Sequence, residues 1–169
     1  MKIELGFWMG TRGLFGFYWK GKFYVVYNHW DSYPSGLGAK ILLEILDADL
    51  EKWKELLEQI VIVDQDVEPT KEQIERLKPY TDLSVSNQST SDWYCLLRHC
   101  QGSITRVLQS GHIVNAVDTD NNPDFQEYAY VVNFDQNTLD FYRGTNDKES
   151  FDLSNQTTLR KLHKKWKTN

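Results

Sequence analysis

Two patterns typical of β-hairpins, one near each end of the chain, are the strongest constraint on its fold. Residues 14–19 and 23–30 are aromatic and β-branched runs separated by Lys20-Gly21-Lys22. Such runs around a glycine-containing turn predict two antiparallel strands. Residues 127–134 and 139–143 repeat the pattern around a second polar turn. A hairpin at each end requires the residues between them to cover a sheet.

Between the hairpins the apolar residues change to helical spacing. Stripes over residues 41–46, 50–61 and 92–109 recur every three to four positions. The last stripe is the longest, and we expect one continuous helix there at the centre of the core. Ser91-Asp92 can cap its first turn, and Gly111 can end it.

Three further elements complete the predicted fold. Thr70 followed by Gln73 predicts a capping box for a helix ending near Leu77. A strand is expected over 113–117 and a final helix over 157–166. The sequence therefore predicts a single α+β domain over residues 1–169, with a mainly antiparallel sheet built from the N- and C-terminal hairpins and packed with central helices.

Composition excludes several classes of protein. The net charge is −5, and the only basic run is Arg160–Lys167, so we expect no nucleic-acid partner. No segment approaches the roughly 20 apolar residues that span a bilayer, so we expect no membrane partner. The first residues lack the pattern of an export signal, and Cys95 and Cys100 are poorly spaced for a bridge. A cytoplasmic location is expected.

The densest group of polar side chains follows the second strand, in the segment Tyr27–Pro34. His29 and Asp31 are two positions apart, which places them on one face if the strand continues. A carboxylate beside an imidazole fixes its tautomer and makes it a usable base. We therefore predict His29 and Asp31 as catalytic residues within hydrogen-bond reach of each other, directly or through one water.

Other side chains are expected around this pair. The hairpin pairing brings Arg12 beside the end of the second strand, where its guanidinium can bind an anion. The predicted ligand-binding residues are Arg12, Asn28, Ser32 and Tyr33, with Trp93, Tyr94 and Glu127 as further candidates from elsewhere in the chain.

A structural interpretation of the same segment remains open. Asp31, Ser32 and Pro34 are turn-forming residues, because Asp and Ser bond their own backbone. In that case His29 has a structural role, and Arg12 and Asp31 form an ion pair that joins the hairpin. The corresponding function is that of a non-catalytic interaction or regulatory protein.

The stretch Gly10-Thr11-Arg12-Gly13 before the first strand resembles the N-terminal nucleophile hydrolases. That resemblance implies cleavage before Thr11, Thr11 as the nucleophile and Asp31 as its supporting acid. The sequence departs from the family in that Lys40 falls on a predicted helix rather than on a strand. Together with Tyr27–Gly38 and Asp92-Trp93-Tyr94, the same stretch also resembles a group of small uncharacterised proteins, which implies no mechanism.

No cofactor or metal is expected. Asp118–Asp124 begins like a calcium loop, but Pro123 and Ala129 stand where an EF-hand needs glycine and a carboxylate. No cysteine and histidine spacing matches a zinc site. The sequence thus predicts an aromatic-walled pocket that binds a small polar or anionic ligand, with hydrolysis of that ligand as one hypothesis.

Overall fold

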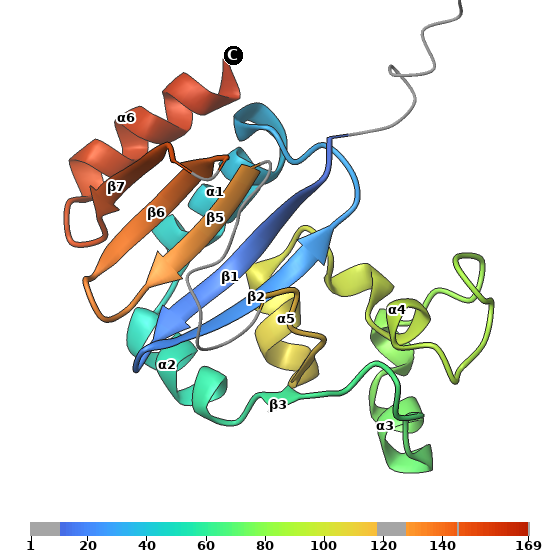
Figure 1. Ribbon diagram of the computed structural model, residues 1–169. Helices are drawn as coiled ribbons and strands as arrows, with labels where there is room; N and C mark the ends of the chain where they lie inside the picture. The colour runs from blue at the N-terminus through green and yellow to red at the C-terminus, as the bar shows by residue number, and fades with distance from the viewer. Residues whose placement is uncertain (1–10, 118–127, 145, 169) are drawn as a thin grey trace, which may run out of the picture.

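A five-stranded sheet forms the centre of the computed structural model, which describes residues 11–117, 128–144 and 146–168 (Figure 1). The strand order is β2-β1-β5-β6-β7. The strands are β1 (Gly13–Trp19), β2 (Lys22–Asn28), β5 (Tyr128–Asn133), β6 (Thr138–Arg143) and β7 (Lys148–Asp152). Both predicted hairpins are present, and the α+β fold with a mainly antiparallel sheet is confirmed.

The first hairpin closes through two residues, Lys20 and Gly21, at φ of 52° and 74°. Positive φ at both central positions defines the turn type whose twist matches paired strands. Both backbone N–H groups donate to the carboxylate of Asp135, at 2.8 and 3.0 Å. The register pairs Gly13 with Asn28, so Arg12 precedes the residue that lies opposite the end of β2.

The two hairpins join through a parallel pairing of β1 with β5, which the sequence did not predict. Strand β7 was also missed, because its residues are mostly exposed and polar at the sheet edge. An edge strand has only one neighbour and needs no apolar face, so it lacks the alternating signal.

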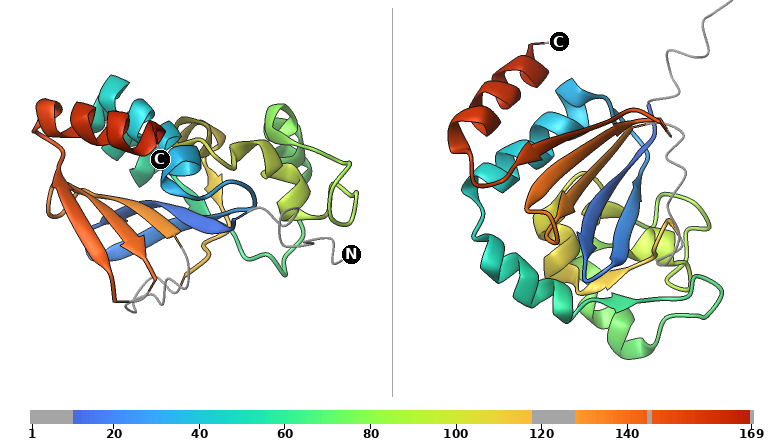
Figure 2. Two further views of the ribbon diagram at one scale, coloured as in Figure 1. Left: turned by 90° about the horizontal axis from the view of Figure 1, so that it is seen from above. Right: turned by 60° about the vertical axis from the view of Figure 1, so that its left-hand side comes forward.

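The longer described helices lie on one side of the sheet, and two short ones, over residues 71–76 and 93–96, lie beyond the edge formed by β2 (Figure 1 and Figure 2). The longer ones are α1 (Ala39–Asp47), α2 (Leu50–Glu58) and α6 (Gln156–Lys167), and the shorter ones are η2 (Pro34–Gly38), α3 (Lys71–Arg76), η3 (Lys78–Tyr80), α4 (Trp93–Leu96), η4 (Arg98–Cys100) and α5 (Ile104–Ser110). Fully buried Phe15 and Tyr130 on the strands face Ile41 and Leu159 on the helices in one core cluster.

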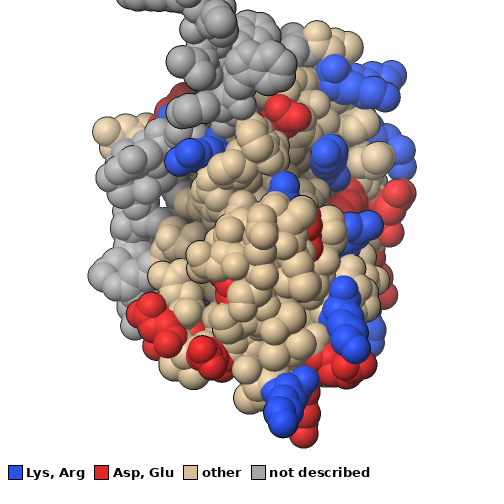
Figure 3. Space-filling view, turned by 90° about the vertical axis from the view of Figure 1, so that its right-hand side faces the viewer, with Lys and Arg blue, Asp and Glu red and all other residues tan. Residues whose placement is uncertain are grey.

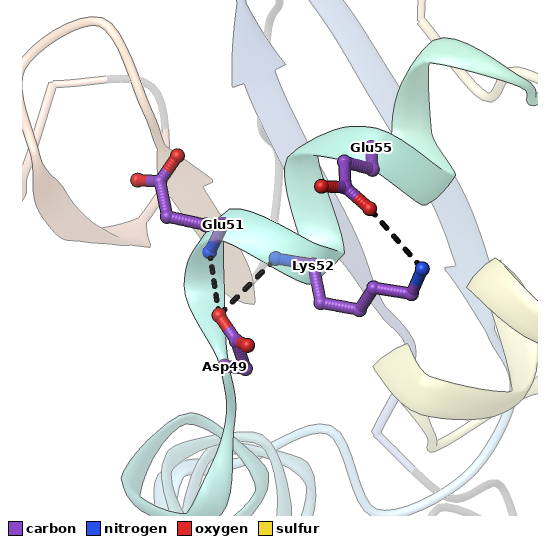
Figure 4. Close-up of polar contacts among 4 residues, drawn as sticks. All are labelled: Asp49, Glu51, Lys52 and Glu55. Atoms are coloured by element: carbon purple, nitrogen blue, oxygen red, sulfur yellow. Dashed lines mark hydrogen bonds and ion pairs between the residues drawn. The ribbon is translucent and has the colours of Figure 1, made fainter.

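Helix α2 shows how local signals set a boundary. The Asp49 carboxylate accepts from the backbone N–H groups of Glu51 and Lys52 at 3.1 and 3.2 Å, and Lys52 pairs with Glu55 on the exposed surface (Figure 4). The capping box of Thr70 and Gln73 is likewise confirmed at the start of α3.

The predicted helix over 50–61 extends too far. It stops at Glu58, and Val61–Ile62 forms strand β3, which pairs in parallel with β4 (His112–Ile113). Of the predicted strand over 113–117, only Ile113 lies in a strand, because β4 covers His112–Ile113. A pair of β-branched residues at a helix end can continue the helix or form a strand. Here pairing with the distant β4 makes Val61–Ile62 a strand.

The prediction of one continuous helix over 92–109 is wrong. Asp92 caps α4 and Gly111 ends α5 as expected. Between these two helices the backbone of Gln101 is extended, so the helix does not continue. The Glu44 carboxylate accepts from Ser103 Oγ at 2.6 Å and from Ile104 N at 2.8 Å, so a side chain of α1 caps a new helix start. This interruption brings Gln101 to the end of β2.

Candidate functional site

The segment after β2 is a closed turn with two of the predicted ligand-binding residues inside it. Asn28 and Ser32 are 5% and 0% exposed. The Asn28 amide donates to the Trp30 carbonyl at 2.7 Å and to Ser32 Oγ at 2.9 Å, so both of its N–H groups are used. Asn28 and Ser32 therefore have structural contacts, and neither lines the cleft described below.

Three backbone contacts fix this turn to the rest of the fold. Ser32 N donates to the Thr11 carbonyl at 2.9 Å, and Tyr130 Oη donates to the Ser32 carbonyl at 2.8 Å. Leu37 N donates to the carbonyl of Asp31 at 2.8 Å. Asp31 has φ of 52°, an uncommon conformation for a residue with a side chain. The turn is thus held rigidly in a strained form.

Among the described residues no direct hydrogen bond between His29 and Asp31 is found, and their contact through one water stays a prediction. Strand β2 ends at Asn28, so the alternation of faces does not reach these residues. His29 Nδ1 is 2.8 Å from Tyr27 Oη, and no hydrogen bond or ion pair joins His29 to Asp31 within the described part of the chain. A hydrogen bond to the exposed carboxylate of Asp31 instead raises the pKa of Tyr33.

His29 lies within electrostatic range of Arg12. Partial burial, followed by the charges of Arg12 and Arg98, lowers the pKa of the His29 imidazole. The unfolded chain then binds this proton more readily than the folded one. The His29 contribution to the free energy of unfolding therefore falls as pH drops below the usual value of 6.5 and becomes constant below the lowered pKa.

We expect an NMR titration of the His29 ring to give a pKa below that of an unfolded-chain histidine. Arg12→Gln should raise this pKa, because it removes a neighbouring positive charge. Arg98→Gln should raise it less, since Arg98 contributes less than Arg12. An unchanged titration in Arg12→Gln would show that the guanidinium does not face the imidazole.

A cleft of about 850 Å³ lies beside this turn. Of the residues predicted for the site, it is lined by Arg12, Trp93 and Tyr94, together with Tyr27 from the same segment. His29 lies next to the cleft rather than in its wall. Its ring contacts Tyr27, and its backbone N–H donates to Gln101 Oε1 at 2.9 Å, and both of these partners line the cleft.

The segment from Trp93 to Gln101 forms one wall of the cleft. It runs from one end of the cleft to the other, and the two ends differ in chemistry. At one end Gln101 and Tyr27 contact His29, close to Arg12. At the other end Trp93 stacks on His112, with ring centroids 6.2 Å apart and an angle of 23°. Trp93 Nε1 also donates to the Val67 carbonyl at 2.7 Å, next to the loop that carries Asp64 and Asp66.

The side of the molecule that bears α3 and α4 is shown in Figure 3. The middle of this face carries few charged side chains, and acidic side chains gather at its lower left. Apolar residues such as Leu97 and Val26 complete the cleft walls. An apolar wall with a few polar groups is typical of small-molecule sites.

Sequence reasoning missed His112, Asp64 and Asp66. A single histidine before an apolar pair and two aspartates in a polar loop give no pattern that distinguishes a site from a surface. Glu127 and Asp118–Asp124 lie outside the described residues. Thr11 is described, with its carbonyl bound by Ser32, and its proposed role as a nucleophile stays a prediction.

The cysteine in the cleft wall is not poised for catalysis. Cys100 is buried, and its Sγ contacts the Arg106 carbonyl at 3.7 Å. Burial raises the pKa of the thiol to about 11. The thiolate is the reactive form, so Cys100 stays protonated at neutral pH. The described residues contain no group of three or more metal-binding side chains.

Comparisons with protein-family models, with curated proteins and with solved structures find no match to this chain. Within residues 11–117, 128–144 and 146–168, none of the helices has both the length and the apolar character needed to cross a bilayer.

Proposed function

We propose that this protein binds a small polar or anionic ligand in the cleft between β2, β4 and the segment Trp93–Gln101. The cleft itself is the observation that carries the proposal. Its volume of about 850 Å³ falls in the range of ligand sites. Its wall combines aromatic rings with a small number of polar groups.

Arg12 is the proposed anion anchor. Its side chain lines the cleft, and a planar guanidinium binds carboxylates and phosphates through two parallel hydrogen bonds. Within the described residues Arg12 forms no ion pair. The alternative in which Arg12 pairs with Asp31 to join the hairpin therefore has no contact to support it.

A thermal-shift screen tests this function. A ligand that binds only the folded state raises the melting temperature, so we expect a rise with at least one of glutamate, succinate, citrate and adenosine monophosphate. Arg12→Gln should abolish that rise. Lys161→Gln, which removes an exposed cation from α6, should leave it unchanged. No rise with any of these compounds would contradict the proposal.

Hydrolysis of the ligand is a separate part of the hypothesis and depends on Thr11. The mechanism implied by the resemblance requires a free amino group at Thr11. Mass spectrometry of the purified protein should then find a chain that begins at Thr11, and Thr11→Val should remove any activity. A chain that retains the preceding residues would exclude this mechanism and leave ligand binding unaffected.

One observation favours the rival function of a protein-interaction module. Trp30 and Tyr33 are 47% and 38% exposed on the rigid turn. Exposed aromatic side chains on a rigid support are common in protein interfaces. Under this alternative, Trp30→Ala would abolish capture of a specific protein partner, whereas the ligand hypothesis expects no change in small-molecule affinity.

A further inference from the structure

His112 presents a free hydrogen-bond acceptor to the cleft. The side chain is 7% exposed, and its Nδ1 lies 2.8 Å from the Ser110 carbonyl. A carbonyl only accepts, so Nδ1 carries the hydrogen, and in the neutral ring Nε2 is the acceptor. Among the described residues every buried side-chain nitrogen and oxygen atom has a partner. No hydrogen bond to Nε2 is found among the described residues, so this atom is not fully buried, and His112 lines the cleft.

Further hydrogen-bond acceptors lie at the end of the cleft that holds His112. Asp64 and Asp66 line the cleft, and both are exposed carboxylates. Asp64 Oδ1 accepts from Asp66 N at 2.9 Å, which leaves the second oxygen of Asp64 and both of Asp66 without a partner among the described residues. Gln65 between them also lines the cleft and carries an amide donor, but the charge at this end is negative, and a protonated amine matches it.

The opposite end of the cleft, with Arg12 and Gln101, offers hydrogen-bond donors. Arg12 supplies its guanidinium, and Gln101 uses its Oε1 for His29 N, so the Gln101 amide N–H groups remain. Asn115, also in the wall, uses its Oδ1 and one N–H of its amide on β2, so one N–H remains for a ligand. A carboxylate on a ligand matches the pair formed by Arg12 and Gln101.

The size of the cleft sets the scale of the ligand. Its volume of about 850 Å³ lies in the upper part of the range for small-molecule sites. A short peptide of about three residues is a ligand of that scale. The apolar wall between the ends, with Leu97 and Val26, suits its middle side chain.

We propose that the ligand is a short zwitterionic peptide. Its amino group binds His112 Nε2 and the carboxylates of Asp64 and Asp66, and its carboxylate binds Arg12 and Gln101. This inference rests on the proposed function and names the ligand class for that same cleft.

Calorimetric titration of the full chain with the tripeptide Ala-Leu-Ala tests the inference. We expect blocking the amino group by acetylation to weaken binding about tenfold, and blocking the carboxylate by amidation to weaken it by a similar factor. Each change removes the charge that one end of the cleft recognises.

His112→Asn is the informative variant. The amide of asparagine can keep the hydrogen bond to the Ser110 carbonyl, but it has no atom at the position of Nε2. The variant should bind the free peptide more weakly than the natural protein does, and acetylation should then weaken binding by less than about tenfold, because only the carboxylates of Asp64 and Asp66 still contact the amino group. His112→Gln is the matched control, because its longer amide reaches the position of Nε2. This variant should regain part of the preference for the free peptide over the acetylated one. A melting temperature for each variant verifies that it is folded.

The outcomes separate the two proposals. If amidation weakens binding and acetylation does not, the anion site stands and the peptide inference is overturned. If Ala-Leu-Ala fails to bind while a simple anion still stabilises the protein through Arg12, the same conclusion holds. If neither the peptide nor any anion binds, the proposed function fails together with the inference.

Discussion

Gly36→Ala is expected to destabilise the protein by about 3 kcal/mol, the upper part of the range for overpacking in a tightly packed site. A methyl group at Gly36 would lie 2.1 Å from the backbone carbonyl oxygen of Asp31. That oxygen already accepts from Leu37 N, so it cannot move away without loss of the bond. The strained turn before η2 would have to open.

Urea denaturation of Gly36→Ala measures this effect. Ser35→Ala is the matched control, because Ser35 neighbours Gly36 and its change adds no atoms. The control should shift the free energy of unfolding by less than about 0.5 kcal/mol, as surface substitutions do. If Gly36→Ala were as stable as the control, the turn would be able to adjust to the added methyl group. The inference that the segment after β2 is rigidly anchored would then be wrong.

Trp166→Ala should cost about 3–5 kcal/mol, the range for removal of a large buried ring. Trp166 is 5% exposed on α6. Its ring lies 5.7 Å from that of Tyr130, 5.1 Å from Phe141 and 6.2 Å from Phe151, all in edge-to-face geometry. The ring therefore joins the last helix to three neighbouring strands.

The measurement is again the free energy of unfolding, with Lys165→Ala as the control on the exposed side of the same helix. Because Tyr130 also holds the Ser32 carbonyl, the cavity left by Trp166→Ala should loosen the turn after β2 as well. Faster amide hydrogen exchange at Ser32 would report this loosening. A loss of stability below about 1 kcal/mol would show that α6 contributes little to the core.

Features whose hydrogen bonds close within a few residues could be predicted from the sequence. The first hairpin, the capping box of Thr70 and Gln73, and the end of α5 at Gly111 are of this kind. Each depends on local backbone geometry and on the few residue types that allow it. The turn-forming character of the segment after β2 could also be predicted, because Asp31, Ser32 and Pro34 are turn-forming residues.

Features that depend on distant partners could not be predicted. Glu44 interrupts the helical stripe over 92–109 from 59 residues away, and no pattern within that stripe indicates the break. The parallel pairing of β1 with β5 and of β3 with β4 joins segments far apart in the chain. A strand of two residues such as β3 has too few positions to show any period.

The sequence by itself indicated part of the cleft wall, because the expected residues Arg12, Trp93 and Tyr94 line it together with Tyr27. Only the tertiary structure decided which side chains face it. Gln101 reaches His29 across 72 positions, and Tyr130 holds Ser32 across 98. These contacts fix the turn with Asn28 and Ser32 inward, and the stacking of His112 on Trp93 places a lone histidine in the wall. Side-chain direction beyond the end of a strand is set by such long-range contacts, since the alternation of faces stops where the strand does.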